Sequence, residues 1–198
     1  MANESIYSPE EIEKICQEVE LQWEYHLLAR GAFPINPEGL PEYVSPKFYV
    51  KRGVEIKVSF RNPLTPVMQR ALAGVHQWLN QNYIIRLYGI LDQYKVIQVG
   101  KESTEPKGKH IKILYKLRPK VGAHSSGYRN SKDYDARKLT KLIRENYDPY
   151  IGDDQGQHYN LAIDTVLYKL KEGYIQFVHL LKGKPKPLPR STRKNINR

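Results

Sequence analysis

Apolar side chains recur at helical spacing along most of this chain, and this periodicity limits the possible fold more than any other feature. Close to the N-terminus, one such stripe consists of Ile12, Ile15, Val19, Trp23 and Leu27. A helix with a single apolar stripe becomes stable when that stripe is buried against another element. The sequence therefore predicts an all-α domain in which several helices share one core.

Local signals predict the position of the first helix and the nature of the segments after it. Ser8 can cap a helix start, and Pro9 suits the first helical position. The apolar stripe continues to about Arg30. Glycines and prolines between residues 31 and 47 exclude a regular element there. From residue 47 to 60 apolar and polar residues alternate, which predicts a small β-hairpin insertion into the helical bundle.

A second, longer helical pattern opens at Thr65-Pro66 and lasts for about thirty residues. It fits either one central helix or two helices separated near Gly74 or Gly89. Gly183 is a natural helix stop near the C-terminus. Shorter helical patterns lie between these points, over residues 111 to 118, 132 to 146 and 160 to 182.

The charge of the chain favours a polyanionic partner. Its 198 residues carry a formal net charge of +11, with a pI near 9.6, as is common for proteins that bind nucleic acid. Six cations lie in the last sixteen residues, where three prolines oppose a packed element. We therefore expect a single domain over residues 1–183, followed by a basic flexible tail over residues 184–198.

Cysteine content and hydropathy predict the cellular compartment. Cys16 is the single cysteine, so the chain cannot form an internal disulfide. The N-terminus lacks the pattern of a secretory signal, and no run approaches the roughly 18 apolar residues of a membrane helix. We therefore expect a cytoplasmic protein without a membrane partner.

The strongest candidate for a functional site lies between residues 117 and 127. Arg118 and His124 stand six residues apart at a predicted helix end, with Pro119 and Gly122 between them. On a regular helix this step turns by about 600°, which leaves the two side chains about 120° apart. A bend at Pro119 or Gly122 would bring the arginine and the histidine together.

This arrangement resembles the signature of HEPN domains, the all-helical domains of many prokaryotic toxin and defence ribonucleases. The signature is an arginine and a histidine separated by four to six residues at a helix end, followed by small polar residues. The resemblance to cyanobacterial members extends to Gly-Tyr-Arg-Asn after the motif, to the helix over residues 135–146 and to residues 163–173. It covers about residues 65–182 and leaves the hairpin region outside.

The resemblance implies a metal-independent endoribonuclease that needs no cofactor and acts as a homodimer, either as a toxin with an antitoxin partner or in antiviral defence. His124 would deprotonate the ribose 2′-hydroxyl or protonate the leaving oxygen, and Arg118 would stabilise the scissile phosphate. A 2′-hydroxyl nucleophile restricts the substrate to RNA. We expect the substrate-binding residues to be Lys120, Ser125, Ser126, Tyr128 and Arg129.

One position departs from the family pattern. Active members often place Asn, Asp or His directly after the arginine, whereas this chain has Pro119. Proline offers neither a side-chain donor nor a backbone N–H, so one polar contributor to the site is missing. A non-catalytic module of the same fold, which binds RNA or a protein partner, is therefore the alternative function.

Two other patterns are alternatives to this site. Glu42, Glu55 and Lys57 loosely match a metal-dependent nuclease, in which carboxylates hold Mg²⁺ and a lysine supports the attacking water. Such a site needs a larger mixed sheet, which the sequence does not predict. Arg70 and His76 repeat the arginine–histidine spacing, but they lie within a helix rather than at its end.

Overall fold

The computed structural model describes residues 6–33, 42–44, 57–97, 108–122, 134–147 and 166–186. These residues are mostly helical, which confirms the predicted all-α class. Two short strands accompany the helices. The helices are α1 (Pro9–Ala32), α2 (Pro66–Gln93), α3 (Lys109–Gly122), α4 (Tyr134–Asn146) and α5 (Tyr168–His179), and the strands are β1 (Glu42–Val44) and β2 (Lys57–Ser59).

The starts of α1 and α2 follow the predicted capping signals. The Ser8 hydroxyl accepts a hydrogen bond from the backbone N–H of Glu11 at 3.2 Å. The Thr65 hydroxyl does the same for the N–H of Met68 at 3.3 Å. Such caps satisfy N–H groups that have no partner within the helix. The long second pattern forms one continuous helix, so neither glycine within it breaks α2.

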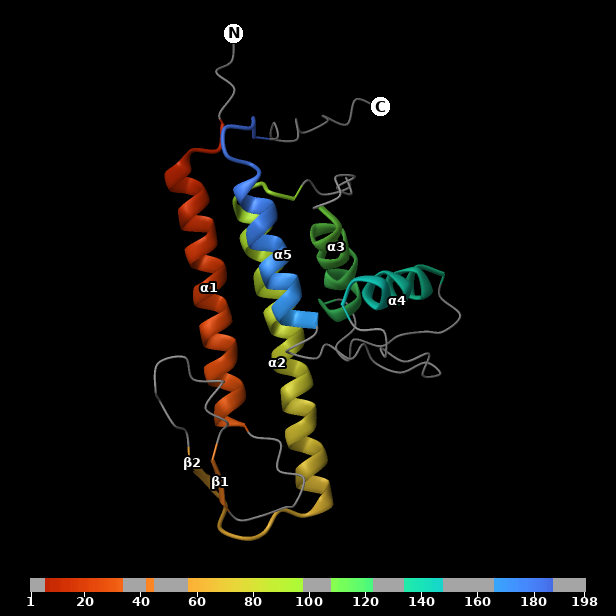
Figure 1. Ribbon diagram of the computed structural model, residues 1–198. Coiled ribbons are helices and arrows are strands. Elements are labelled where there is room, and N and C mark those ends of the chain that lie inside the picture. Colours follow the sequence, from red (N-terminus) through yellow and green to blue (C-terminus); the bar gives the residue numbers. More distant parts are fainter. Residues whose placement is uncertain are drawn as a thin grey trace, which may run out of the picture.

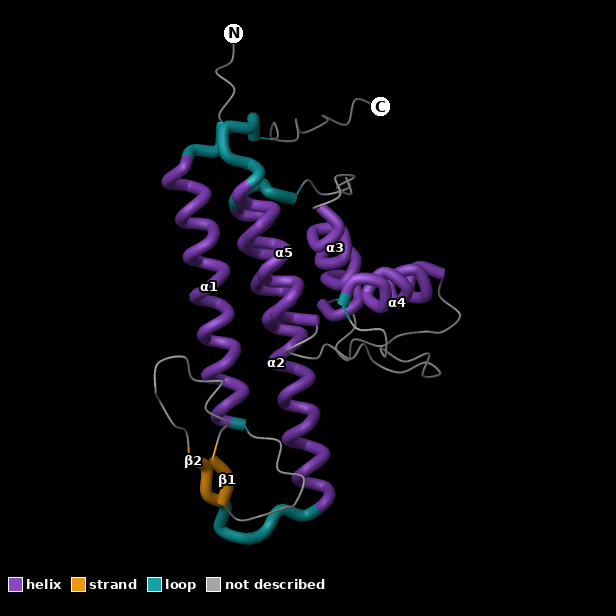
Figure 2. Tube along the Cα trace, in the orientation of Figure 1, coloured by secondary structure: helices purple, strands orange, loops and turns teal. Residues whose placement is uncertain are grey.

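The helices form a bundle with α2 at its centre (Figure 1). Helix α2 packs against α1 and α3, and α5 packs against α1 and α3 as well. Helix α4 crosses beside α3, at a steep angle to the long helices (Figure 2). Helices α1 and α4 therefore lie on opposite sides of the bundle.

The core lies where α1, α2, α3 and α5 meet. Burying a leucine or isoleucine side chain there stabilises the fold by about 1.5–3 kcal/mol. Each helix contributes residues at the helical spacing seen in the sequence. The most deeply buried of them are Ile15 and Val19 of α1, Ile84, Leu87 and Leu91 of α2, Ile113, Leu114 and Leu117 of α3, and Leu170, Tyr174 and Val178 of α5.

The two strands correct part of the hairpin prediction. β1 and β2 pair in antiparallel orientation, with Glu42 opposite Ser59 and Val44 opposite Lys57. β2 lies within the predicted hairpin region, but β1 lies in the segment from which the sequence excluded a regular element. That exclusion was wrong because cross-strand pairing can stabilise three residues between two prolines. The predicted first strand lies outside the described residues.

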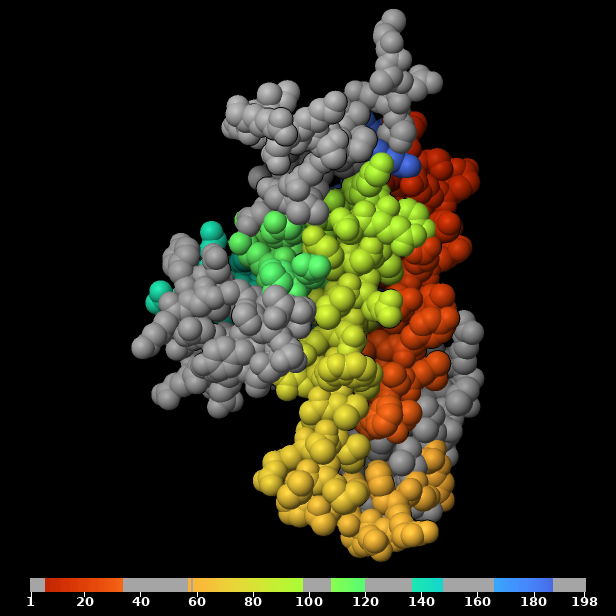
Figure 3. Space-filling view, turned by 180° about the vertical axis from the view of Figure 1, so that it is seen from behind, coloured from red at the N-terminus to blue at the C-terminus, as the bar shows by residue number. Residues whose placement is uncertain are grey.

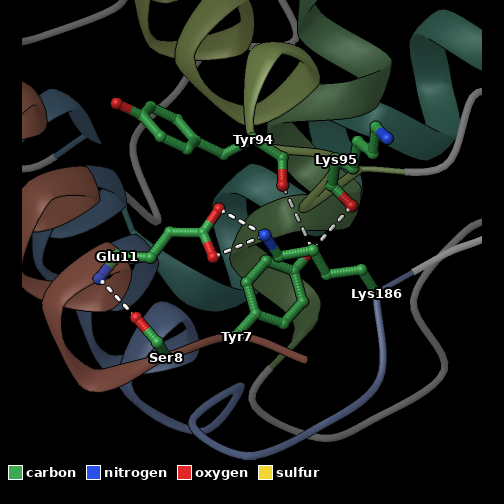
Figure 4. A network of polar contacts seen from close by, with 6 residues as sticks. All are labelled: Tyr7, Ser8, Glu11, Tyr94, Lys95 and Lys186. Atoms are coloured by element: carbon green, nitrogen blue, oxygen red, sulfur yellow. Dashed lines mark hydrogen bonds and ion pairs between the residues drawn. The ribbon is translucent and has the colours of Figure 1, made fainter. Parts of the chain in front are cut away.

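The two ends of the described chain are joined to the end of α2, as Figure 4 shows for Tyr7. Its buried hydroxyl donates to the backbone carbonyls of Tyr94, at 3.2 Å, and Lys95, at 2.9 Å. Its backbone N–H donates to the carbonyl of Lys184 at 3.1 Å, and its carbonyl accepts from Gly183. Burial, with a smaller contribution from Glu11, raises the pKa of Tyr7 to about 12, so the hydroxyl stays protonated.

Residues just beyond Gly183 also belong to this junction. The ammonium group of Lys186 forms an ion pair with Glu11, at 2.6 Å, and lies 5.5 Å from the centre of the Tyr7 ring. Ile6 and Pro185 form an isolated β-bridge. These contacts involve Lys184, Pro185 and Lys186, three residues that the sequence placed in the tail.

A buried lysine links α1 to α5. The ammonium group of Lys171 lies 2.6 Å from Glu20 and 2.7 Å from Glu172. The rings of Tyr168 and Trp23 lie 5.2 Å and 5.8 Å from it. Although burial acts to lower the pKa of Lys171, the hydrogen bonds to Glu172 and Glu20 raise it above its usual range. The lysine therefore stays charged and serves as a structural cross-link.

Gly173 lets α5 approach α3 closely, and this contact can be tested. A Cβ atom on Gly173 would clash with the imidazole ring of His110. We expect Gly173→Ala to lower the free energy of unfolding by about 1–3 kcal/mol because the ring must move. Urea unfolding followed by circular dichroism measures this loss.

A double-mutant cycle supplies the control. In the His110→Ala background the obstructing ring is gone, so Gly173→Ala should be much less destabilising there. An equal loss in both backgrounds would show that the clash with His110 is not the cause.

Candidate functional site

Arg118 lies on α3 directly after the fully buried Leu117, and its side chain is exposed. Its guanidinium carbon lies 5.2 Å from the centre of the Tyr88 ring on α2. A guanidinium group on an aromatic face is attracted by the ring and keeps its N–H donors at its edge. The geometry therefore suits an arginine that is held in place by α2 while it binds an anion.

Tyr88 is half-buried and packs against the core. Burial raises the pKa of its hydroxyl, and Asp92 raises it further, whereas the charge of Arg118 acts in the opposite direction. The phenol is therefore neutral at physiological pH, and the attraction between the two side chains is a cation–π interaction.

The rest of the predicted site is described only in part. Helix α3 continues through Pro119 to Gly122, a few residues beyond the predicted end. A proline in the last helical turn removes a single backbone donor, so the turn can still form. The backbone of Lys120 belongs to this turn, but its side chain lies outside the described residues. So do the other predicted site residues, which are His124, Ser125, Ser126, Tyr128 and Arg129.

Arg70 and His76, the alternative arginine–histidine pair, do not face a common site. Arg70 is exposed, whereas His76 is buried against the core side of α2. Because α2 is continuous, the six-residue step between them leaves their side chains about 120° apart. An arginine in solvent and a buried histidine do not form a shared site for a substrate.

The structure gives little support to a metal-dependent nuclease site at Glu42, Glu55 and Lys57. Glu42 and Lys57 lie on the paired strands β1 and β2, two residues out of register, and Glu55 lies outside the described residues. Within the described part of the chain the sheet has two strands. Among the same residues, no group of three His, Cys, Asp or Glu side chains is placed to hold a metal ion.

Charge is divided between the two sides of the bundle. Helices α3 and α4 together carry nine Lys and Arg residues and two carboxylates. Helix α1, on the other side, carries six carboxylates and two cations. Among the described helices, positive charge is therefore concentrated on the side that holds Arg118 and negative charge on the side formed by α1.

A hollow on α4 extends the basic side. On its described wall it is lined by Arg137, Lys138, Lys141, Leu142 and Glu145, and its volume is about 590 Å³. Lys141 and Glu145 form an exposed ion pair at 3.8 Å, which contributes little to stability. On the described wall of this hollow, cations therefore outnumber carboxylates.

The sequence interpretation missed a buried polar cluster between α1 and α2. His26 and Arg30 of α1 face His76 and Asn80 of α2, and all four side chains are at least nine-tenths buried. Arg30 donates to the amide oxygen of Asn80 at 2.7 Å, and the His26 ring stacks on Tyr83 with 4.9 Å between centres. Both polar pairs stand four residues apart on the inner face of their helix, a spacing that is visible in the sequence.

The histidines of this cluster are held in their neutral form. Burial, the charge of Arg30 and the neighbouring His76 lower the pKa of His26 to about 3. Burial and Arg30 lower the pKa of His76 to about 4. No described residue forms a hydrogen bond with either ring nitrogen of His76 or with the Nε2 atom of His26. Protonation would thus place new charges beside Arg30 in a buried site.

A further buried histidine supports α3. His110 stacks on Tyr147, just after α4, and its Nδ1 atom forms a hydrogen bond with the tyrosine hydroxyl. Burial, with a smaller contribution from Lys109, lowers the pKa of His110 to about 4. This contact fixes α4 against α3 and so positions the basic side.

No protein-family model matches this sequence, and comparisons with curated proteins and with solved structures return no match. Within the described residues, no helix combines the length and the apolar character needed to span a membrane.

The neutral histidines predict a pH dependence of stability. His26 and His76 bind protons near pH 6.5 in the unfolded chain but only near pH 3–4 in the native one. Their contribution is therefore complete above about pH 6.5 and is lost as the pH falls toward 4. We expect His76→Gln to reduce the slope of unfolding free energy against pH by up to about 1.4 kcal/mol per pH unit in this range.

Denaturant unfolding at several pH values measures this slope. A wild-type slope in His76→Gln would contradict the assignment of a buried neutral histidine.

Proposed function

We propose that this chain is a metal-independent endoribonuclease that binds single-stranded RNA on its α3–α4 side. The proposal is supported most directly by Arg118, which is exposed in the basic part of the bundle and stacked on Tyr88. The helical fold and the resemblance of the arginine–histidine motif to HEPN ribonucleases support it as well. We further propose that the activity serves a toxin or defence effector.

The proposed reaction is an attack of the ribose 2′-oxygen on the neighbouring phosphorus. The 2′-oxygen forms a bond to phosphorus while the bond to the 5′-oxygen breaks, which leaves a 2′,3′-cyclic phosphate and a 5′-hydroxyl. His124 assists one of the two proton transfers, which suits an imidazole near neutral pH. Arg118 binds the phosphate oxygens, where negative charge develops in the transition state.

The basic side of the bundle would hold the RNA strand along its path to Arg118. Phosphate contacts to α3 and α4 cations supply affinity without sequence preference, and this affinity decreases with salt. The hollow lined by Arg137, Lys138 and Lys141 offers one such stretch beside α3. The acidic side formed by α1 cannot offer these contacts.

The catalytic assignment predicts the effect of two single substitutions. In excess EDTA, the wild type should cleave labelled single-stranded RNA. Arg118→Ala should reduce the rate by about 10²–10³-fold because one donor set for the transition state is lost. His124→Ala should reduce it by about 10²–10⁴-fold because proton transfer is unassisted.

Arg70→Ala is the matched control, since Arg70 is an exposed arginine of the alternative pair. It should retain the wild-type rate. Loss of activity upon chelation would instead support the metal-dependent alternative.

The substitution of Pro119 for the polar residue of active HEPN members favours a second candidate, a binding module without catalysis. Intact RNA with undiminished binding would support that candidate and overturn the ribonuclease.

Charge reversal on α4 tests where RNA binds. We expect Arg137→Glu combined with Lys138→Glu to weaken RNA binding by about tenfold or more and to flatten its salt dependence. The control, Lys14→Glu combined with Lys182→Glu, makes the same change in net charge at exposed positions away from α4. Fluorescence anisotropy with labelled RNA compares the two. Equal weakening by both variants would show that net charge, and not the α3–α4 side, determines binding.

A further inference from the structure

The buried polar cluster between α1 and α2 contains hydrogen-bonding atoms that have no partner among the described residues. The two helices lie in direct contact on the face of the molecule that Figure 3 shows. The cluster consists of His26 and Arg30 of α1 and His76 and Asn80 of α2, with exposed fractions between 6% and 9%. Buried polar groups in native proteins are almost always hydrogen-bonded. Unpartnered groups at such depth therefore indicate a ligand.

The unpartnered atoms are nitrogens on three of these side chains. Arg30 donates from one amino group to the amide oxygen of Asn80 at 2.7 Å. Its buried Nε–H has no acceptor within the described part of the chain. The same holds for both ring nitrogens of His76 and for the Nε2 atom of His26. Four buried nitrogen atoms, contributed by both helices, are thus available for a ligand.

The charge of Arg30 also lacks a counter-charge among the described residues. A guanidinium group stays positive even in a buried site. The ion pairs that described carboxylates form lie elsewhere, and none includes Arg30. Arg30 lies in the last turn of α1, where the helix dipole offsets only about half an elementary charge. A buried charge without a partner is strongly destabilising, so a negatively charged ligand would stabilise this part of the fold.

The chemistry of the cluster suits an anion better than a metal ion. Arg30 would repel a cation, and burial together with the charge of Arg30 keeps His26 and His76 neutral. An anion would act in the opposite direction, because a nearby negative charge favours the protonated ring. A protonated imidazole donates from both nitrogens, so all four unpartnered atoms become donors. Several charged donors match an oxyanion, which accepts hydrogen bonds at each of its oxygens.

We propose that the buried polar cluster is a binding site for a small free oxyanion of the phosphate or sulfate type. Arg30 binds the oxyanion through its Nε–H, and the two histidines donate to it from α1 and α2. Asn80 holds the Arg30 side chain in position. The site lies on the α1 side of α2, away from the α3–α4 side. It therefore does not depend on the proposed ribonuclease activity.

The titratable groups that face the cluster determine how binding depends on pH. They are Arg30 and His26 on α1, and His76 and Tyr83 on α2. Burial raises the pKa of Tyr83, so its phenol stays neutral. The histidines are therefore the groups that take up protons when the oxyanion binds, and binding should strengthen as the pH falls.

NMR titration of the histidine rings tests the site in the unmodified full chain. Sulfate is the probe because its own charge does not change over the titration. We expect sulfate to raise the pKa of His76 by about one unit or more from its value near 4, compared with chloride at equal ionic strength. An unchanged pKa of His76 in sulfate would overturn the proposal.

His110 is the matched control. Burial lowers its pKa to about 4 as well, but its Nδ1 atom already has a partner in the Tyr147 hydroxyl. Its pKa should be the same in sulfate and in chloride. Equal shifts of His76 and His110 would indicate an adventitious ion only and would overturn the site.

Substitution of Arg30 tests which side chain binds the oxyanion. Sulfate should raise the midpoint of thermal unfolding more in the wild type than in Arg30→Gln, because a ligand of the native state stabilises it. The variant also measures the general stabilisation by sulfate. Arg70→Gln, at an exposed arginine of α2, should respond like the wild type. Equal responses of all three proteins would overturn the site. If Arg30→Gln does not fold, His76→Gln supplies the same comparison.

Two further probes distinguish a free oxyanion from a phosphate group carried by a nucleotide. Inorganic phosphate should reproduce the effect of sulfate on His76. Adenosine 5′-monophosphate should not, because the side chains of the cluster are at least nine-tenths buried. An equal effect of the nucleotide would overturn the free ion as the ligand. RNA cleavage, measured separately, would be unaffected by any of these results.

Discussion

The packing of α2 between α1 and α3 is the contact on which the rest of the structure depends. Ile84, Leu87 and Leu91 are fully buried on its inner face, and this face fixes the positions of α1 and α3 around it. One turn of α2 also places Tyr88 beneath Arg118. Because α2 is continuous, its inner face in the core and the support for the candidate arginine are parts of one rigid element.

The unequal distribution of charge makes the two sides of the bundle electrostatically different. Carboxylates are concentrated on α1 and cations on α3 and α4, with α2 and α5 between them. Screening at physiological salt limits the reach of such fields to about 8 Å, so a strand of RNA must lie close to α3 to benefit. Within that range an exposed arginine with a restricted side chain can select the position of a phosphate. The proposed function therefore depends on one side chain together with the field around it.

The sequence predicted the helices well because their signals are local. Ser8 and Thr65 cap as expected, and the buried stripes follow the helical period. Two features were beyond its reach. The strand at Glu42–Val44 depends on pairing with a segment distant in the sequence, and the nearby prolines argue locally against a strand. The contact of Arg118 with Tyr88 joins residues of two helices, so no spacing along the chain reveals it. The arrangement of Arg118 with His124 stays a prediction, since the histidine lies outside the described residues.

The chemistry of the RNA ends tests the central claim most directly. If Arg118 and His124 assist attack by the 2′-hydroxyl, mass spectrometry of RNA incubated with the protein in EDTA will find products with 2′,3′-cyclic phosphate and 5′-hydroxyl ends. An RNA with a single 2′-deoxy substitution at the cleaved position will stay intact there. Products with 5′-phosphate ends, or cleavage at the deoxy position, would contradict the account.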